Sequence, residues 1–400
     1  MKAAILTSSL ACLFLASLPS SGAESAISSL WPLPEEAAKF DANNDRILTG
    51  EELSGPAARY DLNGDGLATP AEVIHYRSMR NFKKEHPDYA EPKFAPQKIV
   101  RAPERKFENA ILISMDGLDR RVLMELIGSG RVPNLLRIAD SSGPNRLIIN
   151  STIPDYQTET KPGHAVMLTS LIPEHTRVLT NSRFQPIPEG LTIFERVKAA
   201  TGGRVKTVFV SSKRENVGAM TAGELGGRSE CGIPIEGGPY LNAKKSIDVF
   251  SAEDRDEDAA KDAFLDALKE VKGGPFLAFL HFRNPDRSGH ASGRESDAYR
   301  AGCERADRCI GEILDALKAE GLLERTRIFA TADHGFVPGA RGHYYAPWIA
   351  LITNDHSIFT NETIRSYDVP ATIMAGFGVD LESLKPAVSG RDLKNPEACQ

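Results

Sequence analysis

Short runs of apolar residues alternate with amphipathic stretches from residue 108 onward. The apolar runs are AILIS (110–114), TVFVSS (207–212), FLAFLHF (276–282), RIFATA (327–332) and WIALIT (348–353). Residues 257–273 and 296–321 instead carry apolar positions at helical spacing. Parallel strands that are buried on both faces are continuously apolar, whereas their covering helices have one apolar stripe. The alternation therefore predicts an α/β fold with a mainly parallel sheet sandwiched by helices.

The first 23 residues have the pattern of a secretory signal peptide. Lys2 precedes an apolar run over residues 3–18, and small residues then lead to Ala23. This order of segments is typical of a cleaved signal, and the apolar run is short for a membrane span. We therefore expect a secreted or periplasmic protein with residues 1–23 removed and without a membrane span.

Two similar segments follow the signal, FDANNDRILTGEEL and YDLNGDGLATPAEV. Each places oxygen-bearing side chains at positions 1, 3, 5 and 9 and a glutamate at position 12, as calcium-binding EF-hand loops do. The candidate calcium ligands are Asp41, Asn43, Asp45, Thr49 and Glu52 in the first loop and Asp61, Asn63, Asp65, Thr69 and Glu72 in the second. We predict a small α-helical EF-hand pair over residues 36–79 that binds Ca²⁺.

The two loops differ at position 6, where the chain of an EF-hand turns sharply. The second loop has Gly66 there, whereas the first has Arg46, which leaves calcium binding by the first loop open. Residues 80–107, which follow the pair, are rich in charge and proline and lack an apolar period, so they are predicted to be a linker.

Acidic and imidazole side chains lie at the ends of the predicted strands. They are Asp116, Asp286, His290, Asp333, His334 and His343. Ligands of such sheets bind beyond the carboxyl ends of the strands, so these side chains are expected to converge. A mixed Asp and His set suits zinc or a similar divalent ion, and six ligands are too many for one tetrahedral ion but fit two. The remaining histidines have no comparable setting, and we expect no role for His75, His86, His164, His175, His281 and His356.

Several motifs resemble those of the alkaline phosphatase superfamily, particularly its nucleotide pyrophosphatase/phosphodiesterase and PGH-motif phosphatase branches. They are ISMDG, TKPGHA, NPDRSGH, TADHG and a Gly-His before the last apolar run. The resemblance covers residues 108 to 392 and implies an alkaline phosphatase-like domain over residues 108–400. It also implies two zinc ions. Asp116, Asp333, His334 and Thr160 would hold one, and Asp286, His290 and His343 the other.

The same resemblance assigns catalytic roles. Thr160 would be the nucleophile, Asn181 would donate to a phosphoryl oxygen, and Lys213 would reach the transferred phosphate. A second interpretation of Thr160 is the cap of a helix whose first turn contains Pro162. Lys161, beside the nucleophile, is expected to be a solvated side chain.

These features predict an exported dizinc hydrolase of small phosphate esters that acts through a phosphothreonine. Glu215 stands where the monoesterase branch has an arginine, so monoester and nucleotide-type diester substrates both remain open. The net charge of −6 gives no basic surface for a nucleic-acid scaffold. A sulfatase-like hydrolase is disfavoured because that branch needs Cys or Ser in place of Thr160. A catalytically inactive calcium-dependent binding protein is the other alternative, which the complete ligand set disfavours.

Overall fold

The computed structural model describes residues 33–44, 48–60, 67–68, 73, 76, 107–139, 148–153, 158–176, 178, 180–181, 186–221, 224, 238–358 and 363–394. The predicted signal peptide and almost all of the predicted linker lie outside these residues. The same holds for the candidate calcium ligands Asp45, Asp61, Asn63, Asp65, Thr69 and Glu72. Among the helices that the structure describes, none has the length and apolarity that crossing a bilayer requires.

A mixed sheet forms the centre of the large domain. Its strands are β3 (Asn109–Met115), β4 (Ile148–Thr152), β5 (Lys206–Ser211), β6 (Val249–Ala252), β7 (Phe276–Phe282), β8 (Thr326–Thr331), β9 (Trp348–Thr353) and β10 (Ile364–Arg365). They lie in the order β10-β4-β9-β8-β3-β7-β5-β6. Strands β8, β3, β7, β5 and β6 are parallel, and β9 runs antiparallel to both β8 and β4. The predicted mainly parallel sheet is confirmed.

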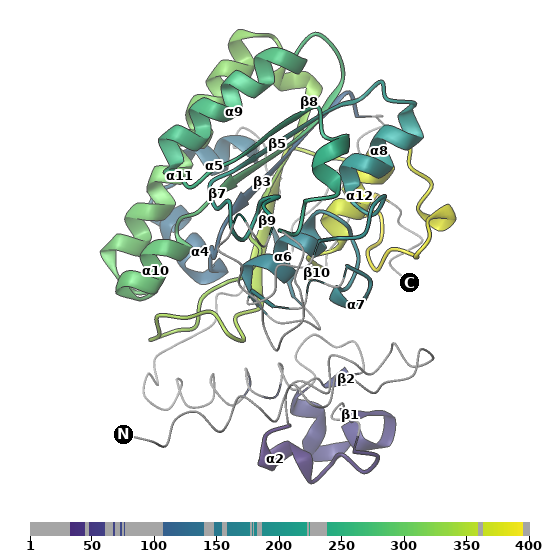
Figure 1. Cartoon of the computed structure of the whole chain (residues 1–400). Helices are drawn as coiled ribbons and strands as arrows, with labels where there is room; N and C mark the ends of the chain where they lie inside the picture. Colours follow the sequence, from purple (N-terminus) through teal and green to yellow (C-terminus); the bar gives the residue numbers. More distant parts are fainter. Residues whose placement is uncertain are drawn as a thin grey trace.

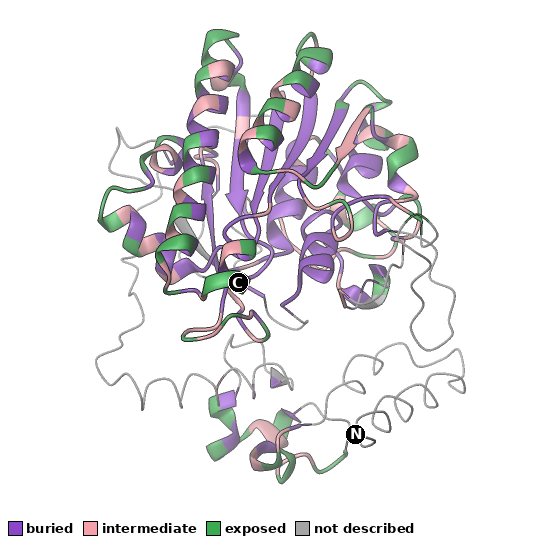
Figure 2. Cartoon of the chain, turned by 60° about the vertical axis from the view of Figure 1, so that its left-hand side comes forward, coloured by how far each residue is buried: buried purple, intermediate pink, exposed green. Residues whose placement is uncertain are grey.

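Helices cover both faces of this sheet (Figure 1). One face carries α4 (Arg120–Gly128), α5 (Pro133–Ile138), α9 (Glu257–Val271) and α11 (Asp297–Ala319), and the other carries α6 (Thr160–Met167), α8 (Ile193–Thr201) and α12 (Asp368–Gly376). Both faces are apolar because successive side chains of a strand point to opposite faces of the sheet. In β3, Ile111 and Ile113 enter one apolar cluster, whereas Ala110 and Leu112 enter the other. Figure 2 shows the buried strands between helices whose outer sides are exposed.

Shorter elements connect the main helices and strands. They are α7 (Pro173–Thr176), α10 (Asp286–Ser292) and the 3-10 segments η5 (Ala243–Ser246), η6 (Leu323–Arg325) and η7 (Leu381–Ser383). Helix α10 begins directly beyond the carboxyl end of β7. Strand β9 runs antiparallel to β8, so it starts at the edge of the sheet where β8 ends. The residues before β9 therefore lie at the same edge as the loops that follow β3, β7 and β8.

The N-terminal segment has an apolar cluster of its own, formed by Leu33, Ala37, Leu48, Ala57, Tyr60, Ala68 and Val73. Its described elements are α2 (Glu35–Ala38), β1 (Leu48–Thr49), η3 (Gly50–Leu53), η4 (Gly55–Tyr60) and β2 (Leu67–Ala68). Strands β1 and β2 pair antiparallel, with Leu48 opposite Ala68. Each of these two residues is the eighth of its predicted calcium loop, so the described strands pair the two predicted loops at the same position.

Candidate active site

The loops that follow β3 and β7 are bonded to each other, which brings two acidic residues together. The amide of Asp116 donates to the carbonyl of Phe282 (2.9 Å), and the amide of Asp286 donates to the carbonyl of Asp116 (2.9 Å). Gly117 has a φ of +70°, and a Cβ there would lie 2.9 Å from the Cβ of Asp286. Both the backbone conformation and the close contact therefore favour glycine at this position.

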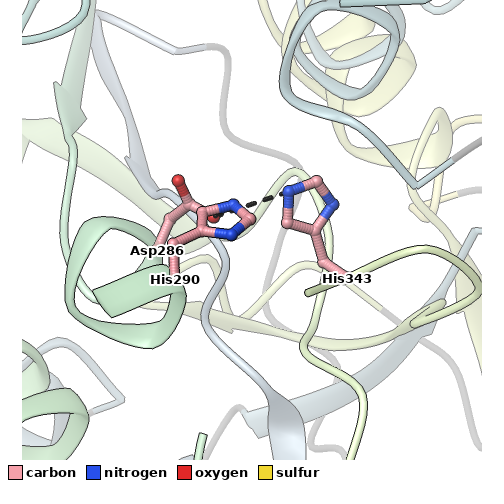
Figure 3. Close-up of side chains that lie close together, drawn as sticks. All are labelled: Asp286, His290 and His343. Atoms are coloured by element: carbon pink, nitrogen blue, oxygen red, sulfur yellow. Dashed lines mark ion pairs between the residues drawn. The ribbon is translucent and has the colours of Figure 1, made fainter. Parts of the chain in front are cut away.

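The structure brings all six predicted metal ligands to this edge of the sheet. The ligand atoms of Asp286, His290 and His343 lie within 4.8 Å of one another, and their side chains point toward a common centre (Figure 3). The ligand atoms of Asp116, Asp286 and His334 form a second group, and they also lie within 4.8 Å of one another. This second group contains Asp286 where the resemblance implies Asp333. Asp333 is nevertheless adjacent, since its Oδ2 lies 3.3 Å from Nε2 of His334.

Each of the three aspartates has one oxygen that is bonded to the protein and one that accepts no hydrogen bond from the described residues. Oδ2 of Asp116 accepts from Nε2 of His281 (3.0 Å), and Oδ1 of Asp333 accepts from the amide of Gly117 (3.0 Å). Oδ2 of Asp286 pairs with Nζ of Lys213 (2.5 Å). In the described part of the chain, the other oxygens, Oδ1 of Asp116, Oδ2 of Asp333 and Oδ1 of Asp286, are buried without a hydrogen-bond partner.

The three histidines are each held through Nδ1 by a backbone carbonyl. Nδ1 of His334 donates to the carbonyl of Gly335 (2.9 Å), Nδ1 of His343 to that of Thr158 (2.6 Å), and Nδ1 of His290 to that of Arg341 (2.8 Å). A carbonyl only accepts, so Nδ1 carries the hydrogen in each ring and Nε2 keeps a lone pair. Nε2 of His334 is buried and has no hydrogen-bond partner among the described residues.

This donor set fits divalent metal ions. Buried polar atoms without partners are costly, and here they converge from neighbouring loops on a common space. Outer hydrogen bonds that fix the tautomer and orientation of a ligand are typical of metal-binding histidines and carboxylates. Oxygen and imidazole ligands without thiolates suit zinc and similar divalent ions.

The charges at the site are consistent with ionised acids and a neutral imidazole. Burial opposes ionisation of Asp286, but the charge of Lys213 outweighs burial and holds the pKa of Asp286 well below its ordinary value. Burial, together with the neighbouring His334, lowers the pKa of His343 to about 3. Lys213 also pairs with Asp116 (2.7 Å), so its ammonium lies between acids of the two predicted centres.

Thr160 is the first residue of α6 and is 2% exposed. Glu159 occupies the N-cap position, so the interpretation of Thr160 as the helix cap is wrong. The helix packs tightly on the end of β8, because a Cβ at Gly163 would lie only 2.5 Å from the carbonyl oxygen of Asp333. This contact, which only glycine permits, holds the start of α6 against the loop that carries Asp333 and His334.

Two histidines to which the sequence assigned no role belong to the surroundings of the site. Nδ1 of His281 accepts from the amide of Ser212 (3.3 Å), so Nε2 carries the hydrogen that it donates to Asp116. Burial lowers the pKa of His281 to about 4 and keeps it neutral. Nδ1 of His164 donates to the carbonyl of Thr160 (2.8 Å) and lies 3.3 Å from Oδ2 of Asp333.

A signal for both histidines existed in the sequence. His281 interrupts the otherwise apolar run FLAFLHF, and His164 is part of the TKPGHA motif itself. Both are fully buried, and a buried imidazole needs polar partners on its two nitrogens. The partners of His281 are Ser212 and Asp116, and those of His164 are Ser114 and the backbone carbonyl of Thr160.

Lys161 is also placed differently from the expectation. Its side chain is fully buried rather than solvated. Its Nζ donates to the backbone carbonyl of Asn181, and its amide donates to Oδ1 of Asn181 (2.8 Å). Asn181 is thus held next to the start of α6, close to Thr160.

The first predicted calcium loop is partly described. The carboxylate of Glu52 accepts from the amides of Ala42 (2.9 Å), Asn43 (3.2 Å) and Thr49 (3.2 Å). The residue at position 12 therefore folds back over the start of its own loop, which is where an EF-hand needs a bidentate glutamate.

Comparison with solved structures identifies the class of fold. A 2-O GAG sulfatase superposes on this chain with a TM-score of 0.50 and 14% identity, covering 73% of this chain and 76% of that one. At this identity the likeness concerns the fold alone, and it confirms the predicted alkaline phosphatase-like architecture.

Sequence comparison identifies the family. The profile of type I phosphodiesterase/nucleotide pyrophosphatase matches residues 110–380, so the chain belongs to that family. A pyrophosphatase/phosphodiesterase of Schizosaccharomyces pombe is 24% identical over 57% of this chain and 44% of its own length. An ectonucleotide pyrophosphatase/phosphodiesterase of Caenorhabditis elegans is 24% identical over 64% of this chain and 31% of its own length. The chain therefore spans less than half the length of these relatives.

Proposed function

We propose that this protein is a two-metal hydrolase of phosphate esters that acts through a phosphothreonine at Thr160. The observation that carries the proposal is the convergence of six ligand side chains, four of which present a buried atom that has no hydrogen-bond partner among the described residues. The family match and the packing of α6 against Asp333 support it. Asp116, Asp333 and His334 would hold one ion with Thr160, and Asp286, His290 and His343 the other.

Two bound divalent ions would supply Lewis acidity, which favours ionisation of a hydroxyl and stabilises charge on phosphate oxygens. The hydroxyl of Thr160 attacks phosphorus in line, forms the new P–O bond, and the ester oxygen leaves. Water then attacks the phosphothreonine, releases phosphate or a phosphate monoester, and returns the hydroxyl to Thr160. Nδ2 of Asn181 donates to an equatorial oxygen during both steps.

Lys213 bears on the class of substrate. Its ammonium lies at the border of the two predicted centres, where it pairs with Asp116 and Asp286. A group bound there would meet this charge, and a monoester, which carries more negative charge than a diester, would gain more from it. Phosphate monoesters and nucleotide-type diesters are both within the proposal. The likeness in fold to a sulfatase does not extend to Thr160, since that branch uses Cys or Ser at this position.

We also propose that the protein is exported and that its N-terminal segment binds calcium. Residues 1–23 have the order of segments typical of a signal peptide. The contacts of Glu52 and the pairing of Leu48 with Ala68 support an EF-hand pair. Calcium would then stabilise the N-terminal segment and leave the chemistry to the other site.

A metal analysis combined with a substrate comparison tests the proposal. We expect about two zinc or similar ions per chain, as two-metal sites require. With the metals bound, the protein should hydrolyse an aryl phosphate monoester or an aryl nucleotide diester much faster than an aryl sulfate. Calcium without a second metal, together with no turnover of either phosphate ester, would instead favour the inactive binding protein. A dominant rate with the sulfate would favour the sulfatase.

A further inference from the structure

Lys161 is an unusual residue for its position. It directly follows the proposed nucleophile, and its side chain is fully buried. Lysine is almost never fully buried unless its ammonium is paired, because removing the charge from water is costly. A buried lysine beside a reacting group therefore calls for a specific contact that a shorter or apolar side chain could not make.

That contact is with Asn181. The amide of Lys161 donates to Oδ1 of Asn181 (2.8 Å), and Nζ of Lys161 donates to the backbone carbonyl of the same residue. Oε2 of Glu159 accepts from the amide of Asn181 (2.5 Å). The residues on both sides of Thr160 thus bind one asparagine that is twenty positions further along the chain.

These bonds fix the orientation of the Asn181 side chain. A backbone N–H only donates, so the atom that faces the amide of Lys161 must be the amide oxygen of Asn181. Nδ2 is then directed away from Lys161, and in the described part of the chain no residue accepts from it. Nδ2 is the atom that would donate to a phosphoryl oxygen. Its position is therefore fixed by contacts from Glu159 and Lys161, the residues on either side of Thr160.

We propose that Lys161 is a positioning residue that holds Asn181 in a fixed place relative to Thr160. The nucleophile and the donor to the phosphoryl oxygen then move as one unit, and their geometry is established before the substrate binds. A charge-assisted hydrogen bond from the ammonium is stronger than a neutral one, which explains a lysine here. This inference rests on the proposed function, because it assigns Asn181 a role in phosphoryl transfer.

A double-mutant cycle tests the inference. Asn181→Ala should lower kcat about 100-fold, the loss typical of one donor to a developing oxyanion. Lys161→Met should lower kcat about tenfold or more, with a smaller change in KM, because misplaced catalytic groups are costly in the transition state. In the Asn181→Ala background, Lys161→Met should change kcat by less than about twofold, since a positioning residue has nothing left to position. Equal fold losses in both backgrounds would overturn the proposal, as would an unchanged kcat in Asn181→Ala alone.

Two further measurements keep the test decisive. Thermal unfolding separates a loss of folding from a loss of positioning, and Lys269→Met, at a lysine that is 69% exposed on α9, controls for removal of a lysine charge. If Lys161→Met does not fold, Glu159→Gln weakens the remaining bond to Asn181, and the same coupling with Asn181→Ala is expected. The proposed function is tested separately by Thr160→Ala, which should abolish turnover. If it does, additive losses in the double-mutant cycle would reject only the role of Lys161.

Discussion

The two predicted metal centres share one edge of the sheet but differ in their access to solvent. Asp116 and His334, in the inner centre, have side chains that are 0% exposed. His290, in the outer centre, is 47% exposed, although its partner Asp286 is only 4% exposed. The inner centre is therefore enclosed by protein, and the outer centre is open to solvent at His290.

The imidazoles of the two centres are supported alike, because His334, His290 and His343 each donate to a backbone carbonyl. The acids differ. In the inner centre, Asp116 accepts from the buried His281, which is itself bonded by Ser212. In the outer centre, Oδ2 of Asp286 pairs with Lys213. Under the proposed function, the enclosed inner centre would hold Thr160 rigidly, and the more open outer centre would suit an oxygen that leaves with the product.

The largest effect is expected from Thr160, which belongs to the inner centre. Thr160→Ala should lower turnover on the order of 10³-fold or more, because the group that attacks phosphorus is lost. Metal content should stay near that of the unchanged protein, since the six side-chain ligands remain. Steady-state rates and metal analysis check both statements, with Thr221→Ala, at an exposed threonine, as the control. Near-normal turnover in Thr160→Ala would show that the nucleophile is a different group.

A matched pair of histidine variants compares the two centres directly. His334→Asn should weaken metal binding on the order of 100-fold, because it removes a ligand from an enclosed position that water does not reach. His290→Asn should weaken it only about tenfold, since water can replace a ligand at an exposed position. Metal retained during dialysis against graded chelator concentrations gives both values. An equal or larger loss in His290→Asn would contradict the distinction between an enclosed and an open centre.

Lys213 links the two centres and should separate the substrate classes. Lys213→Met should slow monoester hydrolysis about tenfold more than diester hydrolysis, since a monoester presents more charge to the lost ammonium. The kcat/KM values for an aryl monoester and an aryl diester measure this, and Lys272→Met is the control at a more exposed lysine. Small and equal losses would indicate that Lys213 supports Asp116 and Asp286 without meeting substrate, and would favour a phosphodiesterase.

The smallest effect is expected outside the catalytic domain. Glu52→Gln removes one charge from the proposed bidentate calcium ligand of the first loop. The melting temperature in calcium should fall by roughly 2–4 °C, the shift expected for about 1 kcal/mol, while the rate of ester hydrolysis stays unchanged. Glu72→Gln makes the same change in the second loop. Thermal unfolding of the unchanged protein with and without calcium is the check, and identical melting temperatures would contradict the calcium proposal.

Much of the fold followed from the sequence. The five apolar runs became β3, β5, β7, β8 and β9 to within one residue at each end. The strands that were not predicted lack that signal. Residues 148–152 are partly polar, residues 249–252 are only partly buried, and residues 364–365 are too short to form a pattern. The antiparallel direction of β9 could not be predicted from its residues, because a strand that is buried on both faces is continuously apolar whichever way it runs.

The ligand side chains were predictable because they directly follow strands, and parallel strands end at one edge. The residues that support these ligands and Asn181 were harder to predict. Lys161 looked like a solvated lysine, yet it is buried because it binds Asn181, and this depends on how a segment twenty residues away folds back. His281 needed the pairing of β7 with β3 to bring it beside Asp116. Local pattern identifies which residues can react, whereas tertiary contacts decide which residues hold them.

The stereochemical course at phosphorus is the most direct test of the central claim. Each in-line displacement inverts the configuration of phosphorus, so attack by Thr160 followed by attack of water gives overall retention. A phosphorothioate diester that is chiral at phosphorus, hydrolysed in isotopically labelled water, reports this outcome even when no intermediate accumulates. The account predicts retention in the unchanged protein and no product above background in Thr160→Ala. Inversion would mean that water attacks the substrate directly, and it would contradict a phosphothreonine intermediate.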